Sequence, residues 1–187
     1  MIYSKLWAFI KESRNYLLIA GLLFMASAVI GFIFPVFLID YITSFMEQIA
    51  GLTDGMGFFR LFLFILGNNL KTTFIVILSG ILAGVSPILL AVFNGYVLGF
   101  IAGKAVGALG TSVLLRLLPH GIFEIPALIL SLGVGLRLGM FIFKKRGKRK
   151  KELIHSFVNS LKVFFYIILP LLVIAAIIES ALIVMLK

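Results

Sequence analysis

The feature that constrains this chain most is a series of long apolar runs. The first, residues 17–39, contains 23 residues and no charged side chain. A helix of about 20 apolar residues is long enough to cross the hydrocarbon core of a bilayer, which is about 30 Å thick. Hydrophobic residues make up 62% of the sequence and charged residues 13%. Soluble domains and disordered chains do not accommodate so many apolar side chains, so this composition predicts a membrane protein.

Five runs are long enough to span a membrane, and they predict five transmembrane helices. They lie at residues 17–39, 61–85, 88–108, 122–143 and 163–186. Inside a bilayer a helix satisfies its own backbone hydrogen bonds, whereas an isolated strand does not. We therefore expect an all-α fold, a polytopic transmembrane helix bundle, in which residues 1–187 form a single membrane domain.

The segments between these runs are shorter or more polar. Residues 1–16 carry apolar side chains at helical spacing and predict an interfacial helix. Residues 40–59 are acidic and contain several glycines, so they predict an external loop with one amphipathic turn. Residues 109–118 are apolar but too short to cross, which leaves a re-entrant segment or a surface helix as alternatives. Residues 152–162 place apolar side chains on one stripe and predict a second interfacial helix.

Seven of the 17 basic residues stand directly after the fourth apolar run and form a basic loop at residues 144–151. They are Lys144, Lys145, Arg146, Lys148, Arg149, Lys150 and Lys151. Basic residues beside a span mark the cytoplasmic side of a cell membrane and attract the anionic lipids of its inner leaflet. With five crossings, this places the amino terminus inside and the carboxyl terminus outside. No aromatic side chain interleaves with these charges to stack on bases, so we do not expect a nucleic-acid partner.

Glycines recur at four-residue intervals in the third span. Gly95, Gly99, Gly103 and Gly107 therefore lie on one face of a helix, where a second backbone can approach closely. The same spacing joins Gly80 to Gly84 and Gly135 to Gly139. We expect these small residues to pack helices within one chain, and a homodimer face is the alternative.

Few polar side chains lie inside the predicted spans, and each needs a partner or a function. An ionisable group in hydrocarbon costs about 2.5–3.5 kcal/mol on insertion scales. The candidates for an intramembrane polar cluster are Asn68, Asn69, Asn94, His120, Glu124 and Glu179. The predicted topology puts all of them except Asn94 in the outer half of the bilayer. A structural hydrogen-bond network, a path for a substrate or proton, and a metal site are the three interpretations of such a cluster.

The metal interpretation depends on three of these residues. A catalytic zinc ion has three protein ligands and a water molecule. His120 and Glu124 supply two ligands and Glu179 a third, so a divalent metal is the alternative to our expectation of no cofactor. The sequence contains no nucleophile-and-base motif, no phosphate-binding loop and no cysteine, and we therefore expect no enzymatic activity.

Two further residues affect the geometry of the fourth span. Pro126 has no backbone N–H to bond to the Ile122 carbonyl, so we expect the regular helix to begin near it and residues 120–124 to form a turn. Arg137 lies 13 residues after Glu124. This spacing is about 220° around an ideal helix, so Arg137 pairs elsewhere or extends towards the inner surface.

Several short patterns together resemble one known family. They are Pro119-His120-Gly121 with Glu124 and Pro126, the Asn68-Asn69 pair, Asn94-Gly95 with Gly99, and residues 175–179, which end at Glu179. The combination resembles the stage II sporulation protein M family of integral membrane proteins, over about residues 17–185. The family's namesake gathers peptidoglycan-degrading enzymes at the engulfing membrane of sporulating bacteria. Because many relatives occur without peptidoglycan, the resemblance implies a more general membrane activity, and it marks these residues as positions to test.

These observations leave three functions open. We favour a non-catalytic, dimeric membrane scaffold whose protein partners dock through the inner basic surface or the outer loop. A small transporter or channel is the first alternative, because the fourth span is interrupted and polar residues lie in the membrane. An intramembrane metal-dependent hydrolase is the second. Convergence of the polar residues on a water-accessible cavity would favour transport or a metal site over the scaffold.

Overall fold

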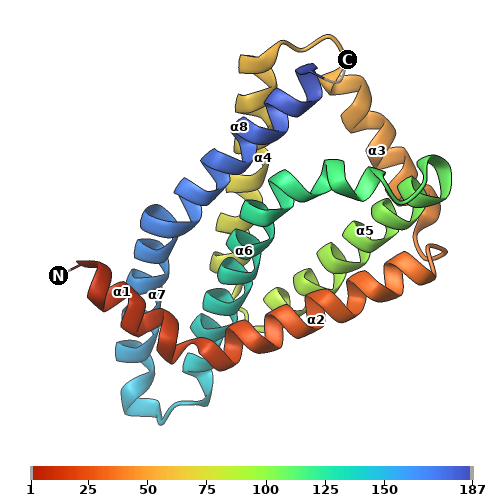
Figure 1. The fold of residues 1–187 in the computed structure, drawn as a ribbon. Coiled ribbons are helices and arrows are strands. Elements are labelled where there is room, and N and C mark those ends of the chain that lie inside the picture. Colours follow the sequence, from red (N-terminus) through yellow and green to blue (C-terminus); the bar gives the residue numbers. More distant parts are fainter. Residues whose placement is uncertain (1, 186–187) are drawn as a thin grey trace.

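The computed structural model describes residues 2–185, with every side chain in that range except those of Ile2 and residues 115–120. Its helices, shown in Figure 1, are α1 (Ile2–Glu12), α2 (Arg14–Ile33), α3 (Ile39–Thr53), α4 (Phe58–Ser79), α5 (Val85–Leu109), α6 (Val113–Gly139), α7 (Arg149–Val163) and α8 (Leu169–Met185). Short 3-10 turns at Met140–Phe143 and Arg146–Lys148 follow α6, and a π-helical segment, Phe164–Ile168, joins α7 to α8. Residues 2–185 contain no β-strand, which confirms the all-α prediction.

Among the residues that the structure describes, five helical segments are long and apolar enough to cross a membrane. They are Arg14–Ile33, Phe58–Ser79, Val85–Leu109, Gly121–Phe143 and Arg146–Met185. Each overlaps one of the five predicted spans, so the number of candidate spans agrees with the prediction and the chain is a multi-pass membrane protein. Large apolar side chains such as Leu22, Leu63 and Leu89 remain exposed on these helices, as expected of surfaces that lipid covers.

The first span is shorter than predicted. α2 ends at Ile33 instead of residue 39, and the chain turns before α3 begins. Pro35 has no backbone N–H with which to continue the helix. Leu38 adopts a left-handed backbone conformation (φ 54°), which is incompatible with a right-handed helix.

The segment after this turn is a helix, and the prediction of a loop there was wrong. α3 covers 15 residues, and its Ile42 is buried in a cluster with Tyr96 and Phe100 of α5. The hydroxyl group of Tyr96 also accepts a hydrogen bond from the Phe37 backbone N–H (2.8 Å), just before α3 begins. The acidic and glycine-rich composition concealed an apolar helical spacing, which places Ile42 against α5.

The most extensive contact between two helices joins α2 to α5, which run side by side in Figure 1. A Cβ atom added at Gly95, Gly99 or Gly103 would meet the backbone of α2, and at Gly99 it would overlap the carbonyl oxygen of Ala28. These glycines therefore pack two helices of the same chain, as predicted. Gly107 is the exception, because a Cβ atom there would have no other heavy atom within 4 Å in the part of the chain that the structure describes.

A second set of glycines packs the turn between α4 and α5 against α6. A Cβ atom at Gly80 would overlap the Gly135 backbone, and one at Gly139 would overlap the backbone nitrogen of Gly84. Gly84 also has a left-handed conformation (φ +73°), which residues with side chains rarely adopt. The second span consequently ends at Ser79 instead of residue 85, because the chain turns at this contact.

α6 is continuous through the region where we predicted a break. Its 27 residues include Pro119 and Pro126, so residues 120–124 are helical and the predicted turn was wrong. A helix accommodates proline by losing one hydrogen bond and bending, and α6 is visibly curved in Figure 1. Residues 113–118 are thus the first turns of α6, instead of a separate re-entrant segment or surface helix.

α7 leads into α8 through the π-helical segment, without the boundary that we predicted near residue 163. Pro170 follows this segment and has no N–H to donate to the carbonyl group of Tyr166, one turn earlier. The wider π turn is the local response to that missing hydrogen bond. Residues 152–162 therefore belong to a continuous helical segment that runs from α7 into α8, and they do not form a separate interfacial helix (Figure 1).

Candidate intramembrane polar site

A cavity of about 120 Å³ lies between four of the candidate spans. Its lining residues are Asn68, Asn69, Thr72 and Thr73 of α4, Asn94 of α5, Glu124 and Leu128 of α6, and Leu172 of α8. Asn68 and Asn69 stand halfway along α4, so the cavity lies near the middle of that span. The predicted topology assigns this pair to the outer half of the bilayer instead.

α4 supplies half of the lining because its polar side chains recur every four residues. Asn68 and Thr72, and likewise Asn69 and Thr73, lie one turn apart on the same face. Thr73 is buried, and its hydroxyl group donates a hydrogen bond to the backbone carbonyl oxygen of Asn69 (2.7 Å). Neither threonine was predicted as a site residue, although the four-residue spacing from the asparagine pair was a usable signal.

Asn94 brings a polar group from α5. Its side-chain nitrogen, Nδ2, donates a hydrogen bond to the backbone carbonyl oxygen of Leu90 (2.8 Å), one turn earlier on the helix. One N–H of this amide is used within α5, which leaves the second N–H as a donor and the amide oxygen as an acceptor for a ligand. The neighbouring residue, Gly95, lets α2 approach this part of α5 closely.

Glu124 supplies a carboxyl group from α6. It is half-buried, and Leu128, one turn further along the helix, lines the cavity beside it. Among the described residues that line the cavity, Glu124 is the only ionisable one. The site thus combines one carboxyl group with neutral amide and hydroxyl groups, an arrangement that can hold a small polar or charged ligand.

Four of the six predicted polar residues line the cavity: Asn68, Asn69, Asn94 and Glu124. The remaining two are Glu179 and His120. Glu179 does not line the cavity. It stands seven residues beyond Leu172 on α8, which is about 10 Å along the helix axis. The side chain of His120 lies outside the described residues. Among the residues that are described, no three His, Asp or Glu side chains come together as a metal site would need.

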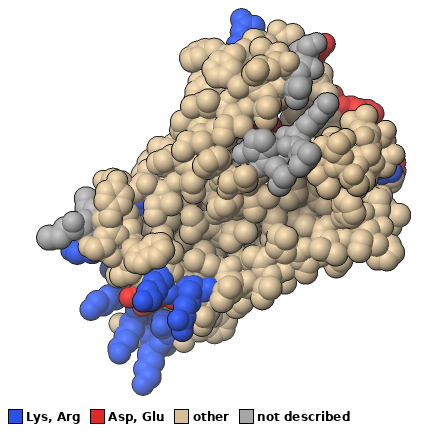
Figure 2. Space-filling view, in the orientation of Figure 1, with Lys and Arg blue, Asp and Glu red and all other residues tan. Residues whose placement is uncertain are grey.

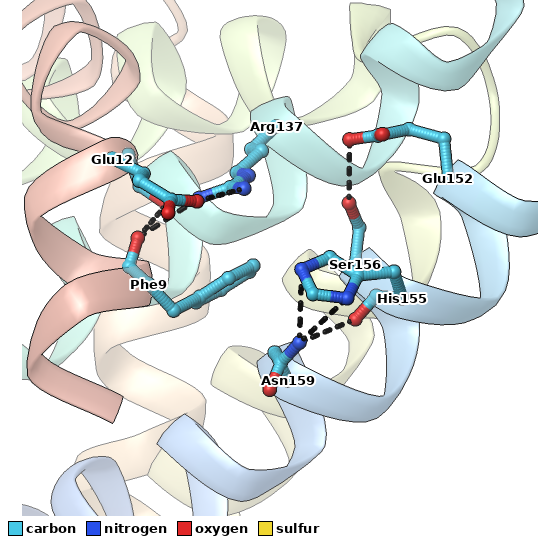
Figure 3. A network of polar contacts seen from close by, with 8 residues as sticks. Phe9, Glu12, Arg137, Glu152, His155, Ser156 and Asn159 are labelled. Atoms are coloured by element: carbon cyan, nitrogen blue, oxygen red, sulfur yellow. Dashed lines mark hydrogen bonds and ion pairs between the residues drawn. The ribbon is translucent and has the colours of Figure 1, made fainter. Parts of the chain in front are cut away.

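A second polar site lies at the other end of α6, and Figure 3 shows it from close by. Arg137 donates hydrogen bonds to the Phe9 carbonyl oxygen and the Ser13 hydroxyl oxygen, both at 2.9 Å. It also forms a salt bridge with Glu12 (2.9 Å), and its guanidinium group lies 4.0 Å from the centre of the Phe9 ring. This confirms that Arg137 pairs away from Glu124, with partners in α1 and at the α1–α2 junction.

The basic loop, residues 144–151, gathers at the end of the molecule formed by α1 and α7, at the lower left of Figure 2. All seven of its basic residues are exposed. A hollow of about 770 Å³ continues this surface along α7 and is lined by Gly147, Lys150, Lys151, Ile154, His155, Val158, Asn159 and Lys162. Within it, Asn159 donates a hydrogen bond to the His155 carbonyl oxygen (2.8 Å; Figure 3).

Comparison with known proteins relates the chain to one family. The family described as stage II sporulation protein M matches residues 20–182. The chain is also similar to two uncharacterized proteins of Methanocaldococcus jannaschii. It is 32% identical to MJ0793 over 125 residues, which cover 62% of this chain and 66% of that protein. It is 37% identical to MJ0706 over 117 residues, which cover 60% of this chain and 51% of that protein. The chain therefore spans about half the length of this second relative. No solved structure matches the chain.

Proposed function

The chain belongs to the stage II sporulation protein M family of membrane proteins, and from its central cavity we propose that it transports a small hydrophilic solute or ion. The observation that carries the proposal is the convergence of Asn68, Asn69, Asn94 and Glu124, from three spans, on one cavity. Polar groups are costly at this depth, and those that occur there commonly mark a path for substrates or ions. This convergence favours transport over the scaffold that the sequence pattern alone favours.

Three of the polar residues that line the cavity differ from the members of a structural network in one respect. Members of a structural network satisfy one another's hydrogen bonds. Asn68, Asn69 and Thr72 make no side-chain hydrogen bond to any other residue that the structure describes. We infer that their amide and hydroxyl groups bind water or a solute.

Irregular helices beside the cavity also support transport. Pro126 stands two residues after Glu124 in α6, and the π-helical segment Phe164–Ile168 ends four residues before Leu172 in α8. Both helices are continuous, and proline bends and π-helical turns inside continuous helices occur frequently at functional sites. Both irregularities give this protein places where the helices around the cavity can change their bend.

A scaffold is the second candidate, and the observation that favours it is the exposed basic loop with the adjoining hollow along α7. This surface suits anionic lipids of the inner leaflet or an acidic region of a partner protein. Co-purification from native membranes tests the candidate, and a chain that repeatedly purifies without a partner would contradict it.

The transport proposal is tested with purified protein reconstituted into lipid vesicles. Encapsulated dyes report the flux of protons and alkali cations, and labelled lipids report lipid transfer. We expect a flux that falls about tenfold or more in Glu124→Gln, equivalent to losing about 1.4 kcal/mol of stabilisation of the transported species. Glu179→Gln is the matched control, because it replaces an intramembrane carboxyl group outside the cavity, and it should keep the wild-type flux. Equal losses in the two variants, or no flux that depends on Glu124, would contradict the proposal.

A further inference from the structure

The hollow along α7 contains three lysines and, among the described residues, no acidic side chain. Lys150, Lys151 and Lys162 line it. The only acidic residue of α7, Glu152, does not line it and instead accepts a hydrogen bond from the buried Ser156 (3.5 Å). None of the three lysines forms an ion pair with another residue that the structure describes. The hollow therefore carries a positive charge that the described part of the chain does not balance.

Apolar side chains lie between these charges. One stripe of the hollow consists of Lys150, Ile154, Val158 and Lys162. Their four-residue spacing keeps them on the same face of α7. Ile154 and Val158 are both exposed. A free phosphate ion would contact only the cations of this stripe, whereas a phospholipid has an anionic headgroup for the cations and an apolar part for the side chains between them.

Aromatic side chains place the membrane end of the hollow at the surface of the bilayer. Tyr166 lies four residues after Lys162, and its ring packs edge-to-face on the ring of Tyr3 in α1 (6.2 Å between ring centres). Tyr3 and Trp7 stand one turn apart on α1, and both are exposed. Tyrosine and tryptophan side chains concentrate at the level of the lipid headgroups. The hollow therefore begins where lipid phosphates lie.

His155 and Asn159 add hydrogen-bonding groups to the middle of the hollow. Asn159 donates to the His155 carbonyl oxygen (2.8 Å), and its amide nitrogen lies 3.3 Å from Nε2 of the His155 ring (Figure 3). The same ring packs against the ring of Phe9 in α1 (6.2 Å between ring centres). The volume of the hollow, about 770 Å³, is within the range of about 300–1,000 Å³ that is usual for small-molecule sites. These features are those of a shaped site, in addition to a charged surface.

We propose that the hollow binds one anionic phospholipid of the leaflet beside the basic loop. The three lysines hold its phosphate, since lysine side chains are long and flexible, and its apolar part lies against Ile154 and Val158. This site differs from the general attraction of a polybasic segment, which concentrates anionic lipids nearby without selecting a position for any of them. The hollow shares no lining residue with the central cavity, so the inference does not depend on the proposed transport function.

The test measures thermal unfolding of the full chain in detergent micelles that contain added lipid. Dioleoylphosphatidylglycerol should raise Tm saturably, whereas the same mole fraction of zwitterionic dioleoylphosphatidylcholine should not. Native mass spectrometry should detect one retained phosphatidylglycerol per chain. In 0.15 M NaCl, which screens charges over about 8 Å, Lys162→Gln should shift the midpoint of the rise about fivefold to higher lipid. This shift corresponds to about 1 kcal/mol, the contribution of one lysine at a membrane surface.

Lys145→Gln is the matched control. It removes the same charge from an exposed position of the basic loop that does not line the hollow, and it should shift the midpoint by less than about twofold. Equal shifts in the two variants would overturn the site, because diffuse attraction to the basic loop does not distinguish them.

Three further outcomes would overturn the proposal. An equal rise in Tm with phosphatidylcholine would show that the anionic headgroup is not recognised. A saturable rise with inorganic phosphate at the same concentration would assign the hollow to a free anion. A rise with an oligoglutamate peptide, but not with phosphatidylglycerol, would assign it to an acidic segment of a partner protein.

Discussion

At the scale of single residues, Arg137 determines how α1 is attached to the bundle. Its side chain is 10% exposed, whereas that of its ion-pair partner Glu12 is 63% exposed. Its other two partners are the carbonyl oxygen of Phe9 and the hydroxyl group of Ser13, which is fully buried. A buried hydrogen bond from a charged donor stabilises a fold more than an exposed ion pair does. The contacts to Phe9 and Ser13 therefore matter more than the salt bridge.

Arg137→Met should lower the free energy of unfolding by about 1.5–3 kcal/mol, because two buried acceptors lose a charged donor. Glu12→Gln should lower it by less than about 1 kcal/mol, because exposed ion pairs contribute little. Denaturant unfolding in detergent measures both variants, and the single tryptophan, Trp7 on α1, provides a local fluorescence signal. Similar losses of unfolding free energy in the two variants would mean that the ion pair between Arg137 and Glu12 is the main contact.

At the scale of helices, the pairing of α2 with α5 depends on direct backbone contact. Lipid tails are as apolar as the helix surfaces, so association in a bilayer relies on close packing instead of the hydrophobic effect. A Cβ atom at Gly99 would overlap the Ala28 carbonyl oxygen, and one at Gly31 would overlap the Tyr96 carbonyl oxygen. Both helices thus contribute glycines, and the contact leaves no room for a methyl group.

Gly99→Ala should destabilise the fold by about 1–3 kcal/mol, the usual cost of forcing an extra carbon into a packed contact. Gly107→Ala is the matched control on the same helix, because no heavy atom lies within 4 Å of the added Cβ in the described structure. It should be neutral or slightly stabilising, since alanine is a better helix former than glycine. Thermal unfolding in detergent compares the two, and equal effects would contradict the assigned contact.

At the scale of the whole molecule, charge is distributed unevenly along the spans. Most of the basic side chains gather at the end formed by α1 and the α6–α7 loop, while α3 at the opposite end carries Asp40 and Glu47 (Figure 2). Basic loops remain on the cytoplasmic side during insertion. We therefore propose that the amino terminus and residues 144–151 face the cytoplasm of the cell and that α3 lies outside.

Because the chain contains no cysteine, a single introduced thiol can test this orientation. Gly147→Cys and Gly51→Cys form a matched pair, since a Cβ at either position has no heavy atom within 4 Å among the described residues. In intact cells, a membrane-impermeant thiol reagent should label the residue 51 variant. It should label the residue 147 variant only after the membrane is permeabilised. Labelling of the residue 147 variant in intact cells would reverse the proposed topology.

Much of this molecule could be inferred from sequence because the signals are local. The five spans and the all-α class follow from hydropathy over about 20 residues, which is a property of each segment alone. Asn68, Asn69, Asn94 and Glu124 stood out for the same reason, as polar residues within apolar runs. The polar residues of the site could therefore be nominated from sequence, although their assembly could not be predicted.

Assembly of the site depended on packing between helices. Glu179 carries the same sequence signal as Glu124, yet only Glu124 reaches the cavity. The depth and rotation of each helix are set by close contacts such as Gly99 with Ala28, which join residues far apart in the chain. Helical periodicity describes one segment at a time, so it cannot specify how neighbouring segments align. For that reason the number of spans and their polar residues were evident from sequence, whereas the cavity that unites them emerged only in the folded bundle.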